Sequence, residues 1–260
     1  MKQRPCLTWF VAAALLLVLS ACTTPYVWQD DKLASVATLE RIFARLGAGF
    51  GKDNNRKAWV RKWVSPIRVE LVNQQSDDDA RLVREAMNKV VPYTGIPVEF
   101  PPKTGGTNFH VRFVKRQELK DEIQKRLQGE EGLSELPEGT VCFALPRGLN
   151  NIGYADIFVA YDGGEQLRDA CIIHETMHAL GLIGHHKAFG PSALFLHNLG
   201  QQEFSLNDRI LLRTLYDPLI EPGMNHDEAI EIAKGLITGF REKLGRTNMA
   251  EDVLHQPLQW

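Results

Sequence analysis

The spacing of apolar residues along the first half of the chain predicts alternating helices and strands. Apolar positions three and four apart predict a helix over residues 32–46, and a helix-like spacing recurs around residues 59–63. Apolar and polar residues alternate in "PIRVELV" (residues 66–72), as in a half-buried strand. The acidic start after "NQQS" predicts a helix to about residue 93, and "TGIPVEF" and "TNFHVRFV" indicate two further strands.

The second half of the chain is centred on one strongly apolar helix. "VCFALP" and "ADIFVAY" are short strand candidates, and "LRDACIIHETMHALGL" (residues 167–182) has the nearly continuous apolar character of a buried central helix. Two helices are predicted after it, over about 205–216 and 226–245. The mixed-charge segment 115–136 favours a solvated face. This order predicts an α+β fold with a mixed, twisted sheet and C-terminal helices.

Composition narrows the class of protein without naming an activity. The chain has 260 residues, of which 44% are hydrophobic and 24% charged, as in ordinary folded globular proteins. Its net charge is −2, so it lacks the positive field with which nucleic-acid binders collect phosphates. We therefore expect no nucleic-acid partner.

Residues 1–21 have the layout of a secretory signal, with Lys2 and Arg4 before an apolar run that is short for a membrane-spanning helix. An uncleaved anchor helix is the alternative. The closing "LSAC" resembles the bacterial lipobox, which implies cleavage before Cys22 and lipidation of that residue. Thr23 resembles the residue that follows the cysteine in lipoproteins sorted to the outer membrane. The expected location is the bacterial cell envelope, at the outer membrane and facing the periplasm. Residues 22–31 would form a tether, and the lipid on Cys22 would be the contact with the membrane.

The cysteines give a second expectation that depends on this location. Cys6 leaves with the signal and Cys22 carries the lipid, so that Cys142 and Cys171 remain. In an oxidising compartment two remaining cysteines indicate one disulfide, although two separately buried thiols are the alternative.

The central helix carries the residues of a metal site. His174 and His178 are four residues apart and therefore lie on one helix face, from which both imidazoles can reach one metal ion. Glu175 lies beside them, where it can take a proton from a metal-bound water. Catalytic zinc sites have three protein ligands and an open fourth position, so a further ligand is needed.

The stretch "HETMHALGLIGHH" resembles the metzincin metallopeptidases, whose signature is HExxHxxGxxH, and most of all their matrixin-like branch. The resemblance implies Zn²⁺ and a third histidine, but Gly184 stands at the family's position. We expect His185, one residue later, to be the third ligand, because a turn can absorb one residue. His186 and the downstream acid Glu203 are alternatives for the third ligand. Two further alternatives are a site with only two histidine ligands and a site that holds no metal.

The resemblance extends over about residues 65–217. "GPSALFLHN" resembles the stretch around the matrixin Met-turn, with Leu194 and Phe195 where the methionine is expected. "LNDRILLRTLY" (residues 206–216) resembles the closing helix, including Asp208. The expected organisation is an N-terminal helical segment over 32–64, a zincin-like catalytic domain over 65–217 and a helical extension over 218–260 packed on it.

Other features resemble a family of bacterial lipoproteins of uncharacterised function that is similar to zincins. They are "KWVSPIRVEL", a lone cysteine before the motif helix, "LLRTLYDP" and "EPGM". Metal-binding histidines are often lost in that family. The sequence therefore leads to two hypotheses. The first is an envelope-tethered zinc-dependent peptidase acting on a peptide or protein. The second is a catalytically silent zincin-fold lipoprotein that serves as a binding or structural module.

Overall fold

A computed structural model describes residues 33–47, 59–103, 105–127, 136, 138–188, 190, 192–195, 204–246 and 254. The signal segment, Cys22, the tether and Glu203 lie outside these residues.

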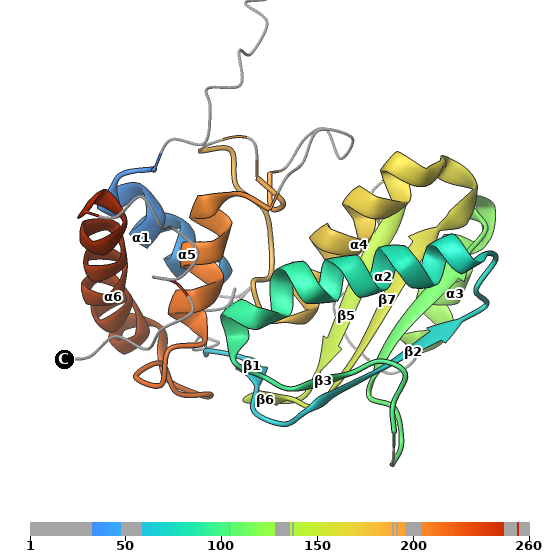
Figure 1. Ribbon diagram of the computed structural model, residues 1–260, viewed down its shortest axis with the longest axis horizontal. Coiled ribbons are helices and arrows are strands. Elements are labelled where there is room, and N and C mark those ends of the chain that lie inside the picture. Colours follow the sequence, from blue (N-terminus) through green and yellow to red (C-terminus); the bar gives the residue numbers. More distant parts are fainter. Residues whose placement is uncertain are drawn as a thin grey trace, which may run out of the picture.

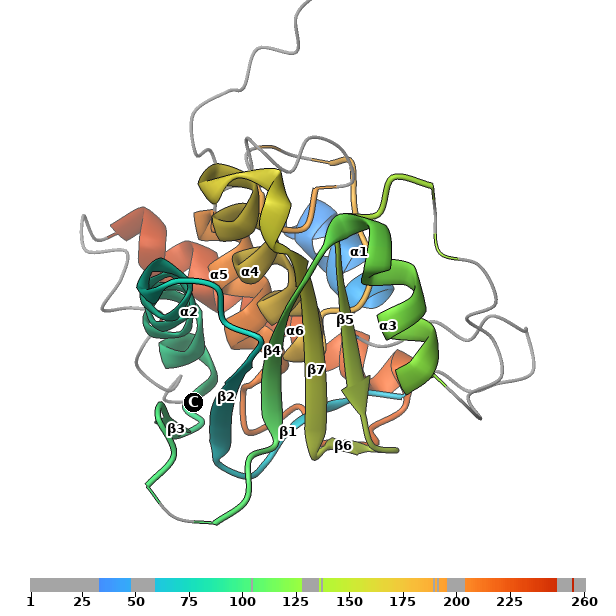
Figure 2. The same cartoon turned by 90° about the vertical axis from the view of Figure 1, so that its right-hand side faces the viewer.

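A mixed five-stranded sheet lies in the right-hand half of the molecule as drawn in Figure 1 and faces the viewer in Figure 2. Its strands run in the order β3 (Val98–Glu99), β2 (Ile67–Val72), β4 (Phe109–Val114), β7 (Tyr154–Ala160) and β5 (Cys142–Arg147). The first four strands are parallel to one another, and β5 joins β7 antiparallel at the edge. A separate two-stranded parallel pair joins β1 (Lys62–Trp63) to β6 (Asn151–Ile152).

Helices cover both faces of the sheet. On one face lie α2 (Asp77–Val90) and α4 (Glu165–Ala179), which pack against each other. The opposite face carries α3 (Leu119–Arg126), whose Leu119 and Ile123 pack with Phe158 in a smaller cluster. Beside this layered part, α1 (Val36–Leu46), α5 (Leu206–Leu215) and α6 (His226–Arg246) pack on one another (Figure 1). Short 3-10 turns cover Val91–Thr94, Arg116–Glu118 and Tyr161–Gly163.

Alternation along the central strands explains the two layers. On β4, Phe109, Val111 and Phe113 belong to the main core under α2 and α4, while His110 and Arg112 point to the other face. On α4 every residue from Ala170 to Ala179 is buried, as its apolar character predicts. The mixed α+β architecture expected from the sequence is therefore present.

The structure corrects one local expectation. Residues 59–63 are not helical: Trp59 forms an isolated bridge with Asn225, and Lys62–Trp63 form β1. Their backbone is satisfied by partners far along the chain: Val60 N–H donates to Met224 O (3.0 Å), and Gly223 N–H donates to Val60 O (2.8 Å). Since Val60, Lys62 and Trp63 are all buried, the segment lacks the two-residue alternation that identifies a strand.

The expected disulfide is present. Cys142, at the start of β5, is bonded to Cys171 on α4, with 29 residues of separation along the chain. The bond fastens the edge strand to the helix one turn before His174. Within the described residues, no helix combines the length and apolar character needed to cross a membrane.

Candidate metal centre

Three histidines converge where α4 ends. His174 and His178 project from one face of the helix, and His185 returns to them after a tight turn. Nε2 of His174 lies 3.0 Å from Nε2 of His178 and 2.9 Å from Nε2 of His185. The three possible ligand nitrogens all lie within 4.8 Å of one another. Tetrahedral zinc with Zn–N bonds of 2.0–2.1 Å would separate its nitrogens by about 3.3 Å, close to this spacing.

The other ring nitrogen of each helical histidine is already used. Nδ1 of His174 is hydrogen-bonded to the carbonyl of Ala193, and Nδ1 of His178 to that of Leu182 at 2.7 Å. A carbonyl only accepts, so both Nδ1 atoms carry the proton and both neutral rings present an Nε2 lone pair. Two lone pairs 3.0 Å apart repel each other unless a cation lies between them. The donor set therefore fits a metal ion such as Zn²⁺, which prefers neutral imidazole fixed in this way.

The turn after α4 is held from three sides. The indole Nε1–H of Trp63 donates to Ala179 O (2.9 Å), and the hydroxyl of Tyr216 donates to Leu180 O (2.9 Å). Gly181 has φ +107°, and a Cβ there would lie 2.2 Å from Arg61 O, so a side chain is excluded. Ile183 N–H donates to the carbonyl of Leu46 at the end of α1 (2.9 Å).

The same turn explains how the histidine spacing is accommodated. Gly184, the residue before His185, has φ +112°, which glycine adopts without strain. Because Gly184 is a second residue with positive φ after Gly181, the turn can accommodate the one extra residue relative to the HExxHxxGxxH spacing. His185 therefore still reaches the rings of His174 and His178. His185 is half-buried, whereas His174 and His178 are buried.

Glu175 lies beside the cluster in an apolar environment. It is 3% exposed, and burial raises the pKa of its carboxyl group to about 8. One interaction opposes this shift, because the backbone N–H of Ala144 on β5 donates to the carboxylate. Oε1 lies 4.0 Å from Nε2 of His174, and Oε2 has no hydrogen-bond partner among the described residues. The carboxyl group is thus placed to accept a hydrogen bond from a molecule bound at the histidines.

His186 points away from the cluster. Its Nε2 lies 2.9 Å from Oγ of Ser192, which donates to Oδ1 of Asp208 at 2.7 Å. Burial lowers the pKa of His186 to about 4, which keeps the ring neutral at ordinary pH. Of the two adjacent histidines, the structure brings His185 and not His186 to His174 and His178.

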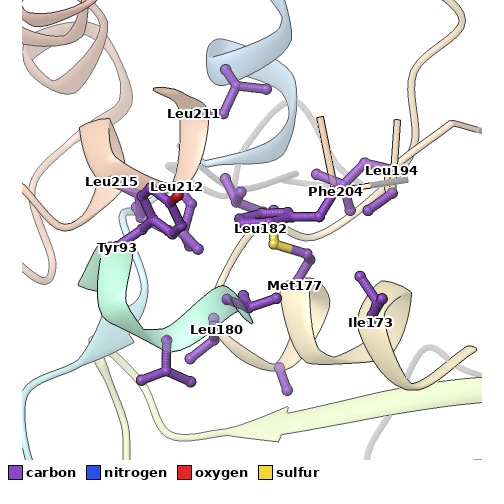
Figure 3. Packing of buried hydrophobic residues seen from close by; sticks show 14 of the residues in the cluster. Tyr93, Ile173, Met177, Leu180, Leu182, Leu194, Phe204, Leu211, Leu212 and Leu215 are labelled. Carbon is purple, nitrogen blue, oxygen red and sulfur yellow. The ribbon is translucent and has the colours of Figure 1, made fainter. Parts of the chain in front are cut away.

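Apolar side chains pack around the helix and the turn that carry the histidines. Figure 3 shows Met177 on α4 beside Leu182 from the following turn and Phe204 ahead of α5. Leu194, at the position where the sequence resemblance places the Met-turn methionine, is fully buried in the same core. Its carbonyl accepts from the backbone N–H of His186 (3.0 Å).

The sequence did not identify Ser192 and Ala193 as residues of the site, although Ala193 is hydrogen-bonded to His174 and Ser192 to His186. The capping-box pattern of Ser205 and Asp208 is visible in the sequence and marks the start of α5. Nothing in that local pattern indicates that Asp208 also binds residues 15 and 16 positions earlier.

The chain belongs to the family described as "Protein of unknown function (DUF2927)", whose model matches residues 37–235. The match runs from α1 into α6 and includes all three clustered histidines. A comparison with curated proteins finds no match.

Proposed function

We propose that this protein is a zinc-dependent peptidase with a metzincin-like catalytic domain, tethered to the bacterial envelope by a lipid on Cys22. The observation that carries the proposal is the convergence of three Nε2 atoms, from His174, His178 and His185, next to the carboxyl group of Glu175. The two helical ligands have their tautomers set by backbone carbonyls, as metal-binding histidines in proteins usually do.

The architecture around the site supports a metzincin-like fold. A mixed sheet with an antiparallel edge strand lies against the helix that carries the first two histidines, and a glycine turn leads to the third. The disulfide between Cys142 and Cys171 fixes that edge strand to the helix. The sequence resemblance over residues 65–217 agrees with this arrangement.

Zinc bound by three imidazoles would activate a water molecule and polarise the carbonyl of a substrate peptide bond. Glu175 would serve as the general base that accepts a proton from the attacking water and returns it to the leaving amine. Burial suits this residue to the task, because it raises the proton affinity of the carboxylate. A cation held by the nearby histidines would lower the pKa of Glu175 again, toward the range in which a base can both accept and release a proton.

The edge strand β5 provides a place for an extended peptide. β5 is the last strand on its side of the described sheet, so no described strand pairs with its outer edge, and Ala144 on β5 donates its N–H to Glu175. An extended substrate can therefore align beside β5 by backbone hydrogen bonds, with its scissile bond near Glu175. This recognition uses the main chain and makes a peptide or protein the substrate class.

The test compares two glutamates of α4 in the zinc-loaded full chain, with denatured casein as substrate. Glu175→Gln keeps the size of the side chain and an oxygen for Ala144 N–H but removes the base. We expect it to retain zinc and to lose activity by about 10²–10⁴-fold. Glu165→Gln, at the exposed start of the same helix, is the control and keeps full activity.

Activity that survives Glu175→Gln or removal of zinc by a chelator overturns the peptidase proposal. Zinc binding without any Glu175-dependent cleavage would favour the second hypothesis, a binding or structural module.

A further inference from the structure

Asp208, the third residue of α5, is fully buried among hydrogen-bond donors. Its Oδ2 accepts from the backbone N–H (3.0 Å) and the hydroxyl (2.8 Å) of Ser205, which closes the capping box of the helix. The same oxygen accepts from Ala193 N–H (2.9 Å), and Oδ1 accepts from Ser192 Oγ (2.7 Å). The last two bonds are not part of helix capping. They join Asp208 to Ser192 and Ala193, in the loop whose Ala193 carbonyl is hydrogen-bonded to His174.

One chain of hydrogen bonds leads from Asp208 to His174. The carboxylate holds the N–H of Ala193, and the carbonyl of the same residue accepts from Nδ1–H of His174. Ala193 is 1% exposed, so water does not compete for either group. The carboxylate therefore fixes the carbonyl that sets the tautomer and orientation of a proposed metal ligand.

A second chain leads from Asp208 to the residue next to His185. Nδ1 of His186 accepts from Ala188 N–H (3.3 Å), so the ring carries its proton on Nε2. Nε2–H then donates to Ser192 Oγ (2.9 Å), and the serine hydroxyl donates to Asp208. Every donor in this chain has one acceptor, and the chain ends on the carboxylate. Holding His186 turned inward holds the adjacent His185 toward the other two histidines.

We propose that Asp208 is a positioning residue of the metal site, which through Ala193 and Ser192 sets the orientation of His174 and of the loop that carries His185. This proposal rests on the proposed function, since it assigns a role toward the zinc ion that those histidines would bind. Histidine ligands commonly donate directly to a carboxylate, and here one residue of the main chain lies between the two groups.

The expected effect is on metal affinity. Loss of a partner that orients a ligand typically weakens metal binding by 10–100-fold. In Asp208→Asn one oxygen becomes an NH₂ group, which cannot accept. Either the bond from Ser192 to Oδ1 or the bond from Ala193 to Oδ2 is therefore lost. Ser192→Ala interrupts the chain through His186, removes the acceptor of Leu194 N–H and leaves the bond from Ala193 to Asp208 in place, and we expect it to weaken zinc binding by about 10-fold.

Asp79 provides a matched control for the structural part of the role. It is also fully buried and also closes a capping box, at the start of α2. Its Oδ2 accepts from the backbone N–H groups of Gln75 (2.8 Å) and Ser76 (3.1 Å), and its Oδ1 lies 3.5 Å from Nε of Arg168 near the start of α4. Among the described residues it has no hydrogen bond to the loop around His185 and Ala193. Asp79→Asn and Asp208→Asn should therefore both lower the melting temperature, and only the second should change the metal site.

The experiment measures the zinc dissociation constant of the full chain by competition with a chelator, together with the visible absorption spectrum after loading with Co²⁺. We expect Asp208→Asn to raise the dissociation constant by 10–100-fold and to shift the Co²⁺ bands, while Asp79→Asn does neither. A wild-type dissociation constant in Asp208→Asn, or an equal loss in Asp79→Asn, overturns the positioning role and leaves the proposed function standing. If Asp208→Asn does not fold, an unchanged constant in Ser192→Ala overturns it. A wild-type protein that binds no zinc overturns the proposed function, and the positioning role with it.

Discussion

Replacing each of the two adjacent histidines in turn should separate metal binding from folding. In the structure His185 is half-buried, and its Nε2 lies 2.9 Å from that of His174. His186 is 3% exposed and is bonded to Ser192 on the opposite side. His185→Ala removes a proposed ligand, whereas His186→Ala removes a buried structural side chain.

The two substitutions differ in the quantity that they change most. Structural zinc sites with four ligands bind with about 10–16 kcal/mol, so one ligand contributes about 2.5–4 kcal/mol, or roughly 10²–10³-fold in affinity. We expect His185→Ala to weaken zinc binding by this factor and to leave the stability of the metal-free protein almost unchanged. His186→Ala removes the bond that Nε2–H donates to Ser192 and the acceptor of Ala188 N–H, and should cost about 1–3 kcal/mol of folding free energy. Its effect on zinc affinity, through the loop, should not exceed about 10-fold.

The assay is zinc retention after dialysis against a chelator, with urea unfolding of each metal-free variant. The reasoning is refuted if His186→Ala loses zinc while His185→Ala keeps it. If both variants keep zinc, a downstream acid such as Glu203 becomes the leading third ligand.

Three further predictions address the disulfide, a buried lysine and the anchor. The double substitution Cys142→Ser and Cys171→Ser should lower the free energy of unfolding by about 3–4 kcal/mol, the chain-entropy value for a loop of this length. Denaturant unfolding without reductant measures this difference, and equal stability of the variant and the wild type would contradict the prediction. Burial lowers the pKa of Lys62 to about 8 from an unfolded value of 10.5, so that between these values the unfolded chain binds more protons than the folded one. Stability should therefore rise by about 2 kcal/mol from pH 8 to 10, and this rise should vanish in Lys62→Met. Mass spectrometry of the mature protein should find acyl chains on Cys22, and an unmodified N-terminus upstream of it would disprove the anchor.

The helix with the first two histidines was predictable because its signal is local. Residues 167–182 are apolar over several turns, and a spacing of four residues puts His174 and His178 on one face whatever surrounds the helix. The strands β2, β4 and β7 were also predictable, since their alternation or apolar runs are long enough to identify. β1 was not, because Lys62 and Trp63 are both buried and their backbone partners lie far along the chain.

The choice between His185 and His186 depends on contacts that a linear pattern does not contain. Spacing shows that one residue must be absorbed, but the two positive φ values, at Gly181 and Gly184, determine how the loop turns. The inward position of His186 depends on Ser192 and, through it, on Asp208. These partners are brought together by the packing of α5, so the sequence favoured His185 but kept His186 and Glu203 as alternatives.

The most direct test of the zinc peptidase account is the coordination of zinc in the loaded full chain, measured by X-ray absorption spectroscopy. The account predicts three imidazole nitrogens and one water oxygen at about 2.0–2.1 Å, the open-site geometry of a catalytic zinc ion. A shell of four protein ligands would indicate a structural site, and a spectrum without histidine ligands would contradict the assignment of His174, His178 and His185.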